Sequence, residues 1–516
     1  MAEQDPALDR ADFVLGLALL AAGTAIAGSL LAGTARSGAP VVHDEFAYLL
    51  QARMLASGHL SMPSPPLPEF FETPHVLVVP RYAAKYFPGH AAMIAPFVLL
   101  GMPWLGPALL FGGTAALLFL ALRLSRLSRF PSIVAPLLLL GNAEAASAFA
   151  GYLSQSTSTF LCVGAVVAAA ALWRQATPAR AALLGTCAGW AALARPFTGL
   201  ALALAAAVLF AELRFLLRPR LALALAAPLV ASALLGLFVC HQITGAWTLT
   251  PWSLYARQYM PVDGPGIGSM VEAPPLRSPP QHMAPLVQSI AASRRAYTAA
   301  TALAEVPRRL RMVLAPLPLA VLGLIALGLG ALTPPLRFAL AFALFHFVLL
   351  LDFHAVSALY LVEVQPMLLL VAAAGVGSIL AFLSRLRPGN HVRFAAVALG
   401  LTSVWLGFIA QDELSERFRA AQSSAPRLHR SDAAFASVSA LRGLVFLRYP
   451  PGWDPNEDWT HNEPDLTHAA LVRALDLGSR DAELMRALPD RPAFRLDLGT
   501  NELTPLRAPQ VELTRP

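Results

Sequence analysis

The sequence has little charge and almost no lysine. Only 13% of its 516 residues are charged and 56% are hydrophobic, whereas soluble domains carry about 25% charged residues. Of its 38 basic residues 37 are arginine, and the one lysine is Lys85. This composition excludes an ordinary soluble protein and indicates a membrane protein.

Cysteine is also scarce. The three cysteines, Cys162, Cys187 and Cys240, all lie within apolar runs. Neither a disulfide framework nor a cysteine metal cluster is therefore expected, and the thiols are interpreted as small apolar side chains.

Long apolar runs dominate the first 411 residues. A helix needs roughly 17–25 apolar residues to cross a bilayer. The first run is preceded by acids rather than by the basic segment of a cleaved signal, so we expect it to remain as a span. Eleven candidate spans follow from the pattern: 13–34, 104–123, 131–150, 155–173, 181–195, 197–213, 221–243, 311–331, 336–352, 356–382 and 393–410.

Arginine-rich short loops indicate the orientation, because such loops stay in the cytoplasm. An even number of predicted spans separates each of these loops from the next, so all four can share one face: 123–129, 174–180, 214–220 and 385–393. If that face is cytoplasmic, the large loops at 35–103 and 244–310, and all residues after 411, lie outside.

Charge also divides the chain into two predicted domains. Residues 1–411 carry 25 bases and 15 acids, and residues 412–516 carry 13 bases and 16 acids. We predict an all-α polytopic membrane domain over 1–411, with about eleven and at most thirteen transmembrane helices. A small extracytoplasmic α/β domain is predicted over 412–516.

The first outer loop begins with a predicted amphipathic helix at 43–58. Acids occupy its first turn, Gly58 is a natural stop, and apolar residues recur at helical spacing at Phe46, Leu49, Leu50 and Met54. A helix of this kind lies on a membrane surface. Asp44 and Glu45 would then stand at the outer mouth of the first span.

The loop continues through a proline-rich turn to a cationic segment. Arg81 and Lys85 precede a short apolar helix predicted at about 90–102. They share a side of the membrane with Asp44, so an acid pair and two cations meet at one water–lipid boundary.

At these residues the sequence resembles the GT-C superfamily of membrane glycosyltransferases, in particular bacterial lipid A aminoarabinose transferases and protein O-mannosyltransferase relatives. The order of spans over about 10–410 agrees with it. The resemblance is carried by Asp44-Glu45 with Tyr48, Arg53-Met54-Leu55-Ala56-Ser57-Gly58, Lys85-Tyr86-Phe87-Pro88, Leu193-Ala194-Arg195-Pro196 and the segment from Thr244-Gly245 to Tyr259.

The resemblance implies transfer of a sugar from a polyprenyl-phosphate donor to an acceptor on the outer face. It makes Asp44 the candidate base or metal ligand and lets cationic side chains hold the lipid phosphate. A carboxylate suits the deprotonation of an attacking hydroxyl, and a fixed cation such as Lys85 or Arg53 suits the departing phosphate. The relatives have an acid shortly after the lysine-aromatic pair, where this chain has Pro88-Gly89-His90, so a metal at that point is in doubt.

Each candidate also has a structural interpretation. Asp44 and Glu45 could cap the surface helix, Lys85 could anchor at the interface, and His90 could be a polar residue at a helix start. Asp44 and Glu45 are taken as catalytic candidates. The substrate-binding candidates are Arg53, Arg81, Lys85, Tyr86, His90, Arg195, Tyr255, Arg257 and Arg308.

The second outer loop carries aromatic residues and then a basic helix. Positive charge outside opposes the usual bias, and an anionic headgroup or phosphate would explain it. Its aromatic residues could stack on sugars or form an interfacial belt. Ionisable residues in membranes are costly and often functional, and those near the spans point to one outer cavity or, for Arg195, to a structural ion pair: Glu144, Arg195, His241, His346, Asp352, His354 and Glu363.

The tail after residue 411 reads as a small soluble unit. Helices are predicted at 431–442 and 479–488, and strands at 444–447, 470–473 and 494–497. Its acidic, aromatic segment 453–465 suits carbohydrate or ion contact, or is a surface loop.

We therefore predict a polyprenyl-phosphate-dependent glycosyltransferase of the bacterial cytoplasmic membrane, acting on its periplasmic side. Expected partners are the lipid donor, a lipid, glycan or protein acceptor and membrane lipids, without nucleic acid. No cofactor is assigned, and a divalent cation is compatible with the pattern. The alternatives are a lipid-linked-sugar transporter or flippase, which would be expected to show internal repeats, and a polysaccharide polymerase or ligase.

Overall fold

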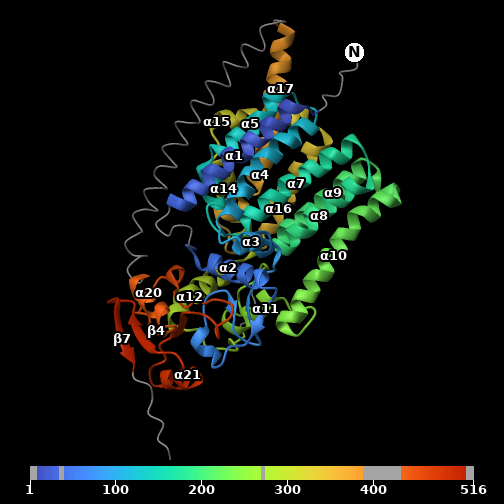
Figure 1. The fold of residues 1–516 in the computed structure, drawn as a ribbon. Coiled ribbons are helices and arrows are strands. Elements are labelled where there is room, and N and C mark those ends of the chain that lie inside the picture. Colours follow the sequence, from blue (N-terminus) through green and yellow to red (C-terminus); the bar gives the residue numbers. More distant parts are fainter. Residues whose placement is uncertain (1–7, 34–39, 269–272, 387–431, 507–516) are drawn as a thin grey trace, which may run out of the picture.

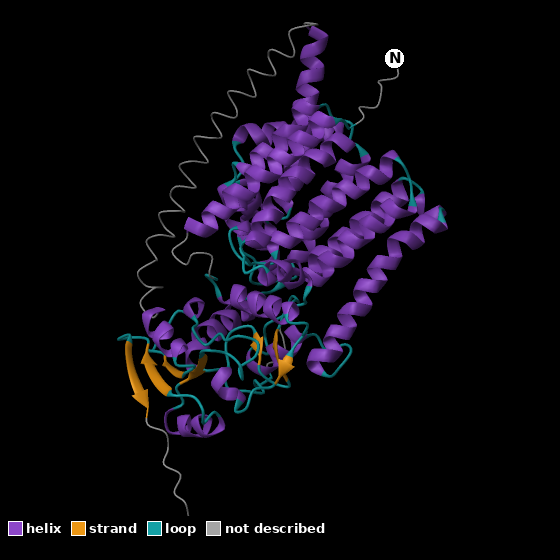
Figure 2. Cartoon of the chain, viewed as in Figure 1, coloured by secondary structure: helices purple, strands orange, loops and turns teal. Residues whose placement is uncertain are grey.

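The computed structural model describes residues 8–33, 40–268, 273–386 and 432–506. The predicted span at 393–410 and the domain boundary at 411/412 lie outside these residues. Long helices pack side by side in the upper part of Figure 1, and the described strands are confined to the layer below them (Figure 2).

The helices of the bundle are largely apolar on all sides. Five described helices are long and apolar enough to cross a membrane, or up to seven if two bent pairs each count as one span. The protein is thus a multi-pass membrane protein, and the number eleven stays a prediction. The bundle contains α1 (Arg10–Gly33), α4 (Leu105–Leu124), α5 (Arg129–Leu140), α6 (Ala143–Phe149), α7 (Gln155–Arg174), α8 (Pro178–Ala194), α9 (Pro196–Glu212), α10 (Pro219–Thr244), α14 (Val306–Leu314), α15 (Leu319–Gly328), α16 (Pro334–Leu350) and α17 (Val364–Leu386).

Two predicted spans are broken. α5 and α6 meet at 68°, where Asn142 caps α6 by accepting the Ala145 N–H at 3.0 Å. The predicted span at 311–331 is bent, because the helical stretches Ala299–Leu314 and Leu319–Ala331 meet at 102°, as a broken span or a re-entrant loop. Pro316 and Pro318 lie at this break, and proline removes the N–H donors that a continuous helix needs.

Close helix packing holds the bundle together. α1 lies along α4, and α8 packs against both α7 and α10. A Cβ at Gly112 would overlap the backbone of Leu20. Glycine at this crossing lets α1 and α4 approach at the distance that favours helix association in membranes.

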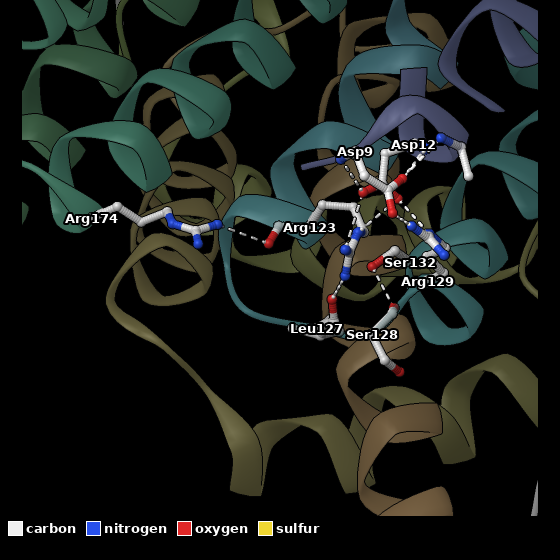
Figure 3. A network of polar contacts seen from close by, with 9 residues as sticks. Asp9, Asp12, Arg123, Leu127, Ser128, Arg129, Ser132 and Arg174 are labelled. Atoms are coloured by element: carbon white, nitrogen blue, oxygen red, sulfur yellow. Dashed lines mark hydrogen bonds and ion pairs between the residues drawn. The ribbon is translucent and has the colours of Figure 1, made fainter. Parts of the chain in front are cut away.

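One end of the bundle carries a closed network of arginines and acids (Figure 3). We call it the arginine end. Asp12 accepts hydrogen bonds from Arg123 at 3.1 Å and from Arg129 at 2.9 Å, and Arg129 also contacts Asp9. Arg174 donates to the carbonyl of Arg123 at 3.4 Å. The start of α1 and the loops after α4 and α7 therefore share one end, as the predicted topology requires.

The opposite end carries a layer built mainly from the two large loops, which we call the loop layer. A short antiparallel sheet of order β1-β3-β2 lies within it. The elements of the layer are α2 (His43–Ala56), β1 (Met62–Pro63), β2 (Val76–Leu77), β3 (Arg81–Ala84), α3 (Gly89–Leu99), α11 (Pro251–Tyr259), α12 (Ala284–Arg295) and α13 (Ala299–Ala304).

Helix α2 forms where the periodicity predicts it, but its setting differs from the prediction. It packs against α3 and β3, and Leu49, Leu50 and Met54 are buried. Phe46 stacks on His461 of the C-terminal part with ring centroids 4.0 Å apart. The helix is therefore enclosed by protein rather than laid on a lipid surface.

Residues 432–506 form a mixed four-stranded sheet of order β5-β4-β6-β7, parallel except for the β6-β7 pair. The predicted strands at 444–447 and 494–497 coincide with β4 and β6, whereas β5 begins two residues later than predicted and β7 was not predicted. Phe446 packs on Phe70 of the first loop at 6.0 Å between centroids. The elements are α20 (Asp432–Ala440), β4 (Leu444–Arg448), β5 (Val472–Leu475), α21 (Asp481–Ala487), β6 (Ala493–Asp497) and β7 (Glu502–Leu506).

Candidate functional site

Asp44 lies in the first turn of α2, where the end of the bundle meets the loop layer. Its Oδ1 accepts a short hydrogen bond from the hydroxyl of Tyr86. The Tyr86 ring stacks on Tyr48, one turn further along α2, with centroids 4.2 Å apart. The motif Asp44-Glu45 with Tyr48 and the motif Lys85-Tyr86 thus meet in space, as two parts of one site.

Two histidines approach the other oxygen of Asp44. Nδ1 of His43 lies 2.9 Å from Oδ2, and Nε2 of His75 lies 3.6 Å from it. The two ring nitrogens are 2.6 Å apart. His75 has φ of 66°, which is uncommon for a residue with a side chain, and such strained positions gather at functional sites.

The charges of this group follow from burial and neighbours. Burial would raise the pKa of Asp44, but His75, His43 and Lys85 hold it well below its ordinary value. Burial, with a contribution from Lys85, lowers the pKa of His75 well below its ordinary value. At neutral pH Asp44 is therefore an anion beside a neutral imidazole.

Lys85 is buried in an aromatic cage. Its Nζ lies 4.0 Å from the centre of the Trp252 ring and 5.1 Å from that of Tyr255. Asp263 lies 3.9 Å from the same atom. Burial lowers the pKa of Lys85, while Asp263 and Asp44 oppose that change. The cage stabilises a cation through its ring faces.

A second polar group lies at the outer ends of the spans. Arg195 sits in the break between α8 and α9 and donates to Glu363 at 3.1 Å. His346 lies 3.8 Å from Glu363, and the guanidinium of Arg195 stacks over Tyr360 at 4.9 Å. The Arg195 side chain keeps 13% exposure, so the structural pair left open in the sequence exists beside a partly accessible guanidinium.

Several predicted site residues are engaged in contacts that hold the fold. Both oxygens of Glu45 accept backbone N–H groups, from Val41 at 2.5 Å and from Tyr152 at 3.0 Å. A Cβ at Gly151 would overlap this carboxylate. Burial raises the pKa of Glu45, although these hydrogen bonds oppose the change. Glu45 thus fastens α2 to the loop after α6.

His90, Arg81 and Arg53 also have defined partners. His90 is buried and donates from Nε2 to the carbonyl of Tyr152 at 2.7 Å. Arg81 donates to the hydroxyl and the carbonyl of Ser61. Arg53 pairs with Glu463 at 2.9 Å and, nine residues beyond Asp44, lies about 13 Å along the helix from it. These contacts favour structural roles for all three.

The predicted residues of the second loop are divided between two settings. The hydroxyl of Tyr255 accepts the backbone N–H of His75 at 2.9 Å, which joins Tyr255 to the Asp44 group. Arg257 is exposed, and Arg308 pairs with Glu305 on the surface. Buried Arg309 donates to the carbonyl of Phe353 at 2.9 Å. Part of this loop's positive charge is therefore hydrogen-bonded to the backbone and does not bind an anionic ligand.

Sequence reasoning missed His43, His75 and Asp263 as site residues. His43 directly precedes the acid pair, and that neighbouring position was the available signal. His75 and Asp263 lie in irregular loop segments with no periodicity, and only the folded chain brings them to Asp44 and Lys85.

The sequence matches no protein-family model, and no curated protein matches it significantly. Solved structures match over most of the chain. The crystal structure of ArnT from Cupriavidus metallidurans bound to undecaprenyl phosphate has a TM-score of 0.51 at 15% identity, covering 94% of this chain and 92% of that one. Its apo form has a TM-score of 0.46 at 14% identity, covering 94% and 93%.

The oligosaccharyltransferase of Archaeoglobus fulgidus in its apo form gives a TM-score of 0.44 at 12% identity, covering 78% of this chain and 56% of that one. Of these three structures, ArnT bound to undecaprenyl phosphate has a TM-score above 0.5, and its likeness extends over nearly the whole of both chains. The chain therefore shares the fold of ArnT, in keeping with the GT-C resemblance drawn from the short motifs.

Proposed function

We propose that this protein is a membrane glycosyltransferase that moves a sugar from a polyprenyl-phosphate donor to an acceptor at the loop-layer end of the bundle. The observation that carries the proposal is the convergence of Asp44, Tyr86 and Lys85 from two separate motifs. The solved structure that shares this fold was crystallised with undecaprenyl phosphate, and that chemistry matches a buried cation beside an acid.

In this reaction an acceptor oxygen attacks the anomeric carbon of the sugar. The bond between that carbon and the phosphate oxygen breaks, and polyprenyl phosphate leaves with the electron pair. Asp44, ionised and partly exposed, takes the acceptor proton or holds a cation that makes the hydroxyl more acidic. Lys85 stabilises the charge that develops on the leaving phosphate.

The neighbouring residues have supporting roles in this proposal. The Tyr86 hydroxyl orients Asp44 through Oδ1, and the aromatic cage holds the ammonium group of Lys85 in place. Arg195 is the second candidate cation for the donor phosphate. Glu45 holds α2 in position and takes no part in proton transfer. The loop layer faces the periplasm, in keeping with the arginine-rich loops at the other end.

The direct test measures release of polyprenyl phosphate by the purified protein in proteoliposomes. A panel of polyprenyl-phosphate sugars would be incubated with the protein and envelope extracts as acceptor source. We expect one donor to give polyprenyl phosphate and a glycosylated product, and Asp44→Asn to reduce release by about a hundredfold or more. Wild-type turnover in Asp44→Asn would remove Asp44 from the mechanism.

The same experiment separates the transporter alternative. A flippase moves the donor across the bilayer without breaking the bond between sugar and phosphate, so it releases no polyprenyl phosphate. If wild-type protein moves an intact donor across the membrane and releases polyprenyl phosphate from no donor in the panel, the protein is a transporter rather than a transferase. A polymerase or ligase is distinguished by its product, a lengthened or transferred glycan.

A further inference from the structure

Three ligand atoms converge at the start of α2 and on the loop before β2. They are Nδ1 of His43, Oδ2 of Asp44 and Nε2 of His75, and they belong to the single such group found among the described residues. The three pairwise distances are 2.6 Å, 2.9 Å and 3.6 Å. Two imidazole nitrogens and one carboxylate are a common ligand set for transition metals.

Hydrogen bonding among the three groups leaves a conflict. Nδ1 of His43 lies within hydrogen-bond distance of both Nε2 of His75 and Oδ2 of Asp44. One N–H cannot point along both directions. If His75 donates to Nδ1 of His43, that nitrogen acts as an acceptor and carries no proton to donate to Asp44. A cation placed between the three atoms attracts all of them at once.

The distances also leave room for such an ion. A circle through the three atoms has a radius of about 1.8 Å, so a point lies about 2 Å from each atom on one side of their plane, which is the usual bond length from zinc to nitrogen and oxygen. Oδ1 of Asp44 is held separately by Tyr86. This arrangement resembles the usual support of a metal ligand, in which a neighbouring group fixes the orientation of a ligating carboxylate.

We infer that His43, Asp44 and His75 form a binding site for one first-row transition-metal dication at the mouth of the bundle. Zn²⁺ and Co²⁺ should bind more tightly than Mn²⁺, and Mg²⁺ least, because imidazole nitrogens favour the later metals. With three protein ligands the site keeps a position for water or a substrate oxygen. The inference rests on the proposed function only in the catalytic use of the ion, which would make an acceptor hydroxyl more acidic.

The site is tested on full-length protein purified through a tag without histidine, stripped with a chelator and titrated with Co²⁺. The readouts are the visible absorption of bound Co²⁺ and the metal content per chain. Wild type should hold about one equivalent. His43→Ala and His75→Asn should each raise the dissociation constant about tenfold or more, whereas His59→Ala, a control on an exposed histidine of the same loop, should leave it unchanged.

His75→Asn is chosen because asparagine tolerates the left-handed backbone that His75 adopts. His43 begins α2 with 15% of its side chain exposed, so the folding of its variant is checked directly. Circular dichroism and size-exclusion profiles equal to wild type establish that both variants fold. Equal Co²⁺ content in the folded wild type and the folded His43→Ala/His75→Asn double variant would overturn the metal site.

Failure of this inference and failure of the proposed function give different results. If Asp44→Asn abolishes polyprenyl phosphate release and Co²⁺ content is equal in the wild type and the histidine double variant, the transferase stands with Asp44 as its base and the metal site is wrong. If Co²⁺ binds with the expected dependence on the histidines but no donor releases polyprenyl phosphate, the metal site stands and the transferase proposal falls.

Discussion

The two ends of the bundle treat their carboxylates in opposite ways. At the arginine end, buried Asp12 is enclosed by two guanidinium groups, and each of its oxygens accepts a hydrogen bond (Figure 3). At the loop-layer end, Asp44 contacts a phenol and two imidazoles, with Lys85 held nearby by aromatic rings. The first arrangement neutralises a buried charge, and the second keeps an ionised carboxylate whose side chain is 34% exposed.

The largest expected effect comes from making the same substitution, aspartate to asparagine, at each end of the bundle. Asp12→Asn leaves Arg123 buried without its carboxylate, and breaking a buried pair costs about 3–5 kcal/mol. We expect it to lower the unfolding temperature while each folded molecule keeps its activity. Asp44→Asn should do the reverse, with little loss of stability and about a hundredfold loss of polyprenyl phosphate release. Thermal unfolding and polyprenyl phosphate release are measured for both variants. If the two variants lose stability and activity to the same extent, the two carboxylates do not have different roles.

Lys85 tests whether the cage holds a cation for the donor. Lys85→Met should reduce turnover by about 10²–10³, because the leaving phosphate loses its fixed charge. It also removes the cation beside Oδ2 of buried Asp263, whose Oδ1 lies 3.7 Å from His354, so Lys85→Met/Asp263→Asn should recover the unfolding temperature but not the activity. Donor affinity and turnover measured in both variants provide the check. Recovery of activity in the double variant would make the lysine structural.

Asp458 tests how the C-terminal part is docked. Its carboxylate is buried and accepts hydrogen bonds from Thr73, at 2.8 Å, and from His282, at 3.2 Å. Burial would raise the pKa of Asp458, but His282 and the hydrogen bonds lower it below the ordinary value of 3.8.

A lowered pKa means that Asp458 stabilises docking above pH of about 4 and that this contribution disappears as the pH falls below it. The protection of the segment around Thr73 against hydrogen exchange, relative to the intrinsic rate at each pH, should therefore fall on acidification. Asp458→Asn should show faster exchange already at pH 7 and a weaker pH dependence. An unchanged exchange rate in the variant would mean that apolar contacts such as Phe70 with Phe446 suffice for docking.

The smallest effect is expected for Arg53. It pairs with Glu463 on the surface, and 36% of its side chain is exposed. Exposed pairs contribute about 0–1 kcal/mol, so Arg53→Ala and Glu463→Ala should each change stability by less than about 1 kcal/mol and leave donor affinity unchanged. A selective loss of donor affinity in Arg53→Ala would restore Arg53 to the substrate site.

Much of the fold could be predicted because its signals are local. Apolar length identifies spans, and the predicted boundary between the spans at 181–195 and 197–213 lies within one residue of the break between α8 and α9. Pro316 and Pro318 lie inside the apolar run at 311–331, where apolar length alone indicates one straight span although proline removes N–H donors there too. The enclosure of α2 was not predictable in this way, since a helix with one apolar face looks the same against lipid and against protein.

By itself, the sequence determined the membrane class, the order of most helices, and the two motifs containing Asp44 and Lys85, because hydrophobic length and helical periodicity act between near neighbours. The tertiary structure decided which of the candidate residues meet. It engaged Glu45, His90 and Arg81 in structural contacts and brought His75 to Asp44 and Asp263 to Lys85. These long-range contacts depend on how the irregular loops pack once the bundle has formed, and no local sequence pattern predicts that packing.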